Sequence, residues 1–171
     1  MNPGTSASIE PFMKDITPHT AALRDSAVSK RVAAAAALGK SGNPVAIIPL
    51  IQALSDPQGK VRTESALALG RLGDAEAVPA LISTLGDPDT MVKIAVIVSL
   101  GTLRDRRATG ALISCLKDTD DRVRIGAAGV LGKFGDPCAI RPLEGLARDR
   151  FEGVRTAAAE ALDRIRKRRS P

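Results

Sequence analysis

Residues 56–74 read DPQGKVRTESALALGRLGD, and the same pattern returns at a fixed distance along the chain. A Leu-Gly pair recurs every 31 residues, with aspartate replacing glycine in the fifth copy: Leu38-Gly39, Leu69-Gly70, Leu100-Gly101, Leu131-Gly132 and Leu162-Asp163. Self-similarity at a period of this length is the signature of a repeat array, in which each copy buries its apolar face against its neighbours. The sequence therefore predicts five stacked repeats.

Apolar spacing and helix-ending residues within copy two predict the structure of one repeat. Apolar residues between positions 47 and 54 fall at i, i+3, i+4 and i+7, which is one face of a short helix, and Asp56-Pro57 ends it. A second apolar face begins at Val61 and runs to Gly73, a residue typical of the left-handed turn after a helix. Asp74 is then suited to cap the first helix of the next copy. Each repeat is predicted to be a helix-turn-helix unit.

Glycine inside the second helix needs an explanation of its own. Gly70 and its counterparts each cost about 1 kcal/mol relative to alanine in a helix interior. Their recurrence indicates that a neighbouring helix packs too close for a side chain.

The motif from Asp56 to Asp74 resembles the short HEAT repeats of the phycobilin-lyase type. The resemblance covers about residues 16–168 and implies an all-α, right-handed α-solenoid (α-α superhelix) of about five HEAT-like repeats, whose second helices line the concave side. The expected repeats are residues 16–43, 44–74, 75–105, 106–136 and 137–168. Residues 1–15 are expected to form a partly disordered N-terminal extension, and residues 169–171 to end a basic C-terminal tail.

Two charged columns keep the 31-residue step. The acidic column is Asp25, Asp56, Asp87, Asp118 and Asp149, and the basic column six residues later is Arg31, Arg62, Lys93, Arg124 and Arg155. The resemblance implies that the two columns pair within and between repeats as a structural ladder. A phosphate-binding stripe of cations is the alternative reading.

Composition argues against catalysis. Among 171 residues there are one histidine, His19, and two cysteines, Cys115 and Cys138, which cannot supply a Cys₄ or Cys₂His₂ metal site. Without a histidine beside them, the cysteines lack the base that activates a thiol nucleophile. We therefore expect no enzyme activity, no cofactor, no metal and no catalytic residue.

Charge and hydropathy predict where the protein works. No run of 18 apolar residues and no basic-then-apolar secretion signal is present, so we expect a soluble, cytoplasmic protein without a membrane span, either a monomer or a weak homo-oligomer. The net charge is +6, and removing the five basic groups in residues 164–171 leaves +1 for the rest. Arg166, Lys167, Arg168 and Arg169 could therefore contact a polyanion. The absence of interleaved aromatic residues argues against specific nucleic-acid binding.

Variable positions of the second helix carry the functional prediction. The motif leaves positions 63, 64, 67 and 71 free, and copies three and four fill several of them with apolar residues. Clustered exposed apolar groups mark interaction sites, so we predict that a partner binds here, on the concave face: Leu67, Ile94, Val98 and Ile125. The competing interpretation is that Met91, Ile94, Ile97 and Val98 are core residues, through a small rotation of the helix.

The leading functional hypothesis is a non-catalytic scaffold or adaptor that binds a protein segment along the second-helix face. An auxiliary nucleic-acid or anionic-surface binder, using the basic columns and the basic tail, is the first alternative. The second alternative, an accessory subunit like that of a tetrapyrrole lyase, follows only from the name of the resembling repeat family.

Overall fold

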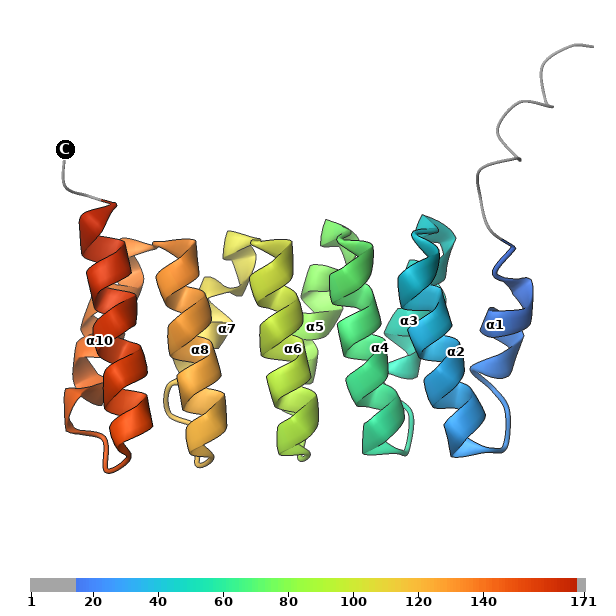
Figure 1. The fold of residues 1–171 in the computed structure, drawn as a ribbon, viewed down its shortest axis with the longest axis horizontal. Helices are drawn as coiled ribbons and strands as arrows, with labels where there is room; N and C mark the ends of the chain where they lie inside the picture. Colours follow the sequence, from blue (N-terminus) through green and yellow to red (C-terminus); the bar gives the residue numbers. More distant parts are fainter. Residues whose placement is uncertain (1–14, 169–171) are drawn as a thin grey trace, which may run out of the picture.

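The computed structural model of this protein describes residues 15–168, and within that range the regular structure is entirely helical. The expected N-terminal extension therefore lies almost wholly outside the described residues, as does the end of the basic tail. The second helices are α2 (Val28–Ser41), α4 (Gly59–Leu72), α6 (Thr90–Leu103), α8 (Asp121–Phe134) and α10 (Glu152–Lys167). The first helices are α1 (Thr17–Ala22), α3 (Ile47–Ala53), α5 (Val78–Thr84), α7 (Thr109–Cys115) and α9 (Ile140–Glu144). Figure 1 shows the long second helices in one row, with α3, α5 and α7 behind them and α1 beside α2 at the end of the row.

Each first helix from α3 onward is entered through a short 3-10 turn that the helical periodicity did not predict. The turns are η2 (Pro44–Ala46), η3 (Ala75–Ala77), η4 (Arg106–Ala108) and η5 (Pro137–Ala139), and a further one, η6 (Gly145–Arg148), follows α9. The residue before each entry turn caps it: the Asp74 carboxylate, for example, accepts the Glu76 N–H at 2.8 Å. The predicted caps are thus confirmed, but they cap a 3-10 turn that precedes the helix.

Left-handed residues end four of the second helices, as predicted, whereas α10 ends at Arg168 in a right-handed conformation. Gly42, Gly73 and Gly135 follow α2, α4 and α8 with φ values of 68°, 77° and 70°. Arg104 takes the same place after α6 with φ 54°, although this backbone conformation is strained for a residue other than glycine. The repeat geometry therefore overrides the preference of the local sequence at this one turn.

Leucines and alanines fill a continuous core between the two layers. One leucine from each full first helix and one from each second helix through α8 has no exposed surface: Leu38, Leu50, Leu69, Leu81, Leu100, Leu112, Leu131 and Leu143. Burying a leucine side chain contributes about 1.5–3 kcal/mol, so stability is distributed along the array. This is the expected behaviour of a solenoid.

Close helix packing explains the recurring glycines. A Cβ atom built on Gly39 would lie 2.7 Å from the Cα atom of Ala68, and one on Gly132 would lie 2.8 Å from that of Ala161. The neighbouring backbone leaves no space for a side chain, which confirms the prediction. The fifth position of the column, Asp163, is exposed on α10.

Candidate functional site

Ion pairs between adjacent repeats link the two charged columns. Arg62 holds the Asp87 carboxylate with two hydrogen bonds, from Nε at 2.7 Å and from Nη2 at 2.9 Å. Arg31 holds Asp56, and Arg124 holds Asp149, in the same two-point geometry. Lys93 makes one contact with Asp118, at 2.6 Å. The structure therefore brings together the basic residue of one repeat and the aspartate of the next.

Each ladder arginine also binds its own repeat. Nη1 of Arg62 donates to the backbone carbonyl of Asp56 at 2.9 Å, so one guanidinium joins a loop to the following repeat. The hydrogen bond from Arg31 lowers the pKa of the Asp56 carboxyl more than its burial raises it. The four paired cations have side chains only 8–14% exposed, which leaves little surface for a phosphate.

The ends of the columns differ from the middle. Asp25 pairs with Lys30 inside its own repeat, at 3.1 Å. Arg155 donates to the backbone carbonyls of Asp149 and Arg150 and has no carboxylate partner among the described residues. The ladder thus consists of four pairs between neighbouring repeats, within residues 15–168.

The four predicted partner-binding residues differ in exposure. Val98 is 52% exposed, whereas Leu67, Ile94 and Ile125 are half-buried against the core. Met91 is also 52% exposed. The interpretation that places Met91 and Val98 in the core is therefore wrong. A small helix rotation cannot bury both residues while the Leu and Gly columns keep their packing.

The free positions are not uniformly accessible. Ala95, which occupies one of them in copy three, is 4% exposed, because α6 is buried along that side. Ile97 is 1% exposed and belongs to the core. The motif alone therefore overestimates how much of the second helix faces solvent.

A groove lies between α6 and α8 on the face formed by the second helices. It has a volume of about 560 Å³, and its lining includes Val98 from α6 and Ile125, Gly126 and Gly129 from α8. We call it the α6–α8 groove. It brings together two of the four predicted residues, Val98 and Ile125, while Leu67 and Ile94 lie outside its lining.

Sequence reasoning missed several residues of the α6–α8 groove. Gly126, Gly129, Val130 and Arg104 line it and were not predicted as site residues. The usable signal was that each departs from its own column in the repeat. Gly129, for instance, stands where copies two and three carry Leu67 and Val98.

The basic tail continues α10 and makes contacts with the array. Arg166 pairs with Glu144 at 2.7 Å, and Lys167 pairs with Asp163 at 2.8 Å. Arg168 donates to the backbone carbonyl of Lys133 at 2.8 Å. Arg169 lies outside the described residues. These three side chains are exposed, yet each already has a partner in the array.

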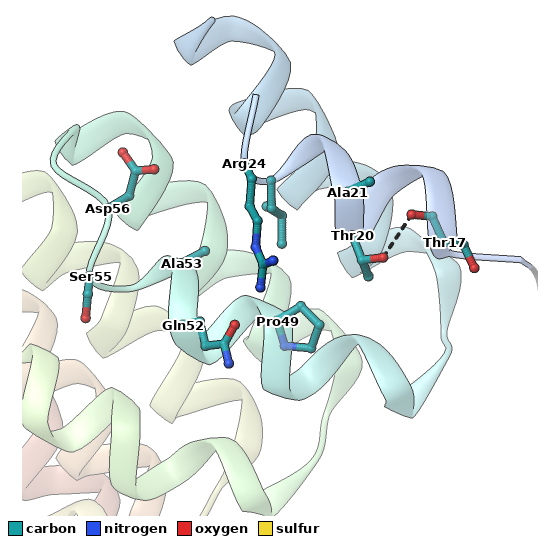
Figure 2. Close-up of a pocket in the computed structure, with 10 residues that line it drawn as sticks. Thr17, Thr20, Ala21, Arg24, Pro49, Gln52, Ala53, Ser55 and Asp56 are labelled. Atoms are coloured by element: carbon teal, nitrogen blue, oxygen red, sulfur yellow. Dashed lines mark hydrogen bonds between the residues drawn. The ribbon is translucent and has the colours of Figure 1, made fainter. Parts of the chain in front are cut away.

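A second cavity, of about 430 Å³, lies between α1 and α3 on the other layer (Figure 2). The Arg24 side chain extends toward Pro49 and Gln52, and the Thr20 hydroxyl donates to the Thr17 carbonyl at 2.9 Å. Its carboxylate, Asp56, is already held by Arg31. The groups around this cavity do not converge on a common point where a ligand could be held.

The candidate nucleophiles and metal ligands are dispersed. Burial raises the pKa of the Cys115 thiol to about 11, so this thiol stays protonated at neutral pH. Cys138 is exposed, and its hydrogen bond with Asp136 raises the pKa of its thiol. Within residues 15–168, no cluster of three or more His, Cys, Asp or Glu side chains could hold a metal ion. No helix in that range is long and apolar enough to cross a membrane.

Comparison with known proteins identifies the repeat. The family of HEAT repeats matches residues 16–90 and 78–163. No curated protein matches the chain. Among solved structures, the complex of CpcE and CpcF of phycocyanin lyase from Nostoc sp. PCC7120 contains a chain that is 29% identical, with a TM-score of 0.78 over 98% of this chain and 70% of that one.

A designed armadillo repeat protein in complex with the peptide (KR)4 is also similar. It is 19% identical, with a TM-score of 0.67 over 88% of this chain and 81% of that one. At this identity the likeness shows the α-solenoid fold alone.

Proposed function

Because the chain belongs to the HEAT-repeat family, we propose that it is a non-catalytic scaffold that binds a segment of another protein on the face formed by its second helices. One observation carries this proposal: the exposed Val98 and the half-buried Ile125 line the same α6–α8 groove in the central repeats. Exposed apolar side chains beside a groove are characteristic of interaction sites.

Two further observations support a protein partner. The chain of known structure that is 29% identical belongs to a complex of CpcE and CpcF, so a relative of this fold assembles with another protein. The ladder cations are bound to aspartates and largely buried, which favours an apolar contact surface over a stripe of phosphate contacts.

A pull-down with matched variants tests the proposal. Val98→Asp places a charge at the α6–α8 groove, and Val45→Asp places the same charge on the 3-10 turn η2 before α3; the two valines are 52% and 62% exposed. Proteins captured from native lysate by the wild type should be lost with Val98→Asp and retained with Val45→Asp, while both variants keep native circular dichroism. Equal capture by both variants would refute the second-helix face as the binding surface.

The identity to a chain of the CpcE and CpcF complex favours one second candidate, an accessory subunit of a tetrapyrrole lyase. A visible absorption spectrum of protein purified from its native source is the direct test. A pigment band that copurifies with the folded protein would support this candidate. A spectrum without visible absorption, after incubation with free bilin as well, would count against it.

A further inference from the structure

Two glycines of α8 have no packing reason to be glycine. A Cβ atom built on Gly129 would meet nothing within 4 Å, and one on Gly126 would meet only the Ile97 side chain, at 3.4 Å. Gly132 on the same helix is different, because its neighbour is backbone at 2.8 Å. Glycine weakens a helix interior, so Gly126 and Gly129 reduce stability and, in return, keep the α6–α8 groove open.

Val130 separates the two helices that border the groove. At the point of closest approach, Gly39 meets Ala68, Gly70 meets Ser99 and Gly132 meets Ala161, whereas Gly101 meets the larger Val130. The branched side chain stands between α6 and α8, and α8 packs less extensively on α6 than on α10. The gap between α6 and α8 is therefore part of the packing of the array.

One end of the groove is positively charged. Arg104 directly follows α6, and Lys133 lies in the last turn of α8, so both cations reach the same end of the lining. Neither has an acidic partner among the described residues, and the lining contains no carboxylate. At the equivalent position of copies two and five, Arg71 and Arg164 are paired with Glu64 and Glu160.

We propose that the α6–α8 groove selects an acidic protein segment: one aliphatic side chain of the segment inserts between Val98 and Ile125, and an adjacent carboxylate pairs with Arg104 and Lys133. This inference rests on the proposed function and specifies its partner. The apolar walls are aliphatic, which fits a leucine-like side chain better than a nucleic-acid base, for which aromatic stacking is the usual contact. Charge complementarity makes the segment acidic.

Selection from a phage-displayed library of random peptides on the full chain provides the test. We expect the selected peptides to combine a large aliphatic residue with neighbouring Asp or Glu. Their affinity for purified variants is then measured by fluorescence polarisation. Gly129→Leu fills the groove and should weaken binding about tenfold or more, as the loss of an apolar anchor does. The double variant Arg104→Glu with Lys133→Glu should weaken binding and remove most of its salt dependence.

Matched controls separate the possible outcomes. Gly110→Leu adds the same side chain to α7, where a Cβ atom would also meet nothing within 4 Å, and should leave affinity unchanged. Binding that survives both groove variants but is lost with Leu67→Lys would overturn the groove inference and leave the proposed function standing. Peptides that are basic, or that tolerate Gly129→Leu, would overturn the inference as well. If no peptide is selected, or if binding ignores every second-helix variant, both proposals fail.

Discussion

Removing one ladder aspartate tests what holds neighbouring repeats together. Asp87→Ala leaves Arg62 without the carboxylate that it contacts at 2.7 Å and 2.9 Å, at a site where the two side chains are 14% and 8% exposed. Losing one partner of a fully buried pair costs about 3–5 kcal/mol. Arg62 keeps its hydrogen bonds to the Asp56 and Pro57 carbonyls and also interacts with the Asp89 carboxylate. We therefore expect a loss of about 2–3 kcal/mol in the free energy of unfolding.

The assay is thermal unfolding followed by circular dichroism, with Asp25→Ala as the matched control. For a chain of this size, a loss of that magnitude lowers Tm by about 4–12 °C. The Asp87 carboxylate accepts the Asp89 N–H at 2.8 Å, and the Asp25 carboxylate accepts the Ala27 N–H at the same distance, but Asp25 pairs only with the exposed Lys30. Asp25→Ala should therefore lower Tm clearly less. Equal Tm values for the two variants would refute the claim that the pair between repeats stabilises the array.

Further predictions concern the glycines, the strained turn and acid stability, each measured by urea unfolding. Gly132→Ala should lower the free energy of unfolding by about 1–3 kcal/mol through overpacking. Gly129→Ala should raise it by up to about 1 kcal/mol, because alanine favours a helix interior and nothing lies against it there. Changes of the same sign in the two variants would contradict the packing argument. Arg104→Gly should raise the free energy of unfolding by about 1 kcal/mol, because glycine adopts the left-handed backbone conformation without strain. A lower free energy of unfolding would show that the turn is unstrained. The hydrogen bond from Arg31 lowers the pKa of Asp56. For Asp87, burial raises the pKa, but the hydrogen bonds from Arg62 and the Asp89 N–H together lower it by more, so its pKa is also lowered. The ladder's contribution should therefore be complete above the ordinary aspartate pKa of about 3.9 and be lost as the pH falls below it; constant stability down to about pH 2 would contradict this.

Periodicity was enough to predict the architecture, because the residues that define a repeat are those whose packing is the same in every copy. The pair Leu69-Gly70 has a buried leucine and a glycine against the small Ser99, and a small neighbour recurs in copies one and four; in copy three the leucine is buried as well, but its glycine meets Val130. The end of α4 at Gly73 followed from the same reasoning. The 3-10 turns before the first helices were missed, because apolar spacing over three residues does not distinguish a 3-10 turn from the first turn of an α-helix.

The site was harder to predict, because exposure depends on the distance between neighbouring helices. Ile94 and Val98 are four residues apart on one face of α6, and the helical period treats them alike. In the structure Ile94 is half-buried and Val98 is 52% exposed. The difference arises where α8 carries Gly126 and Gly129 and where Val130 stands between the helices, so it depends on side chains about 30 residues away in sequence.

The array can tolerate the α6–α8 groove because its stability is distributed. The two glycines together cost about 2 kcal/mol relative to alanine, comparable to the 2–3 kcal/mol expected of one ladder pair, and the pairs on both sides of the groove are intact: Arg62 with Asp87, and Arg124 with Asp149. Across the groove itself, Lys93 replaces arginine and holds Asp118 through one contact instead of two. The single Lys93–Asp118 contact, the loosely packed Gly126 and Gly129, and the Val130 side chain between α6 and α8 therefore all lie at one interface between repeats. If that interface is also the binding site, an occupied groove should restore contact between α6 and α8, and a bound acidic peptide should slow amide hydrogen exchange most in these two helices.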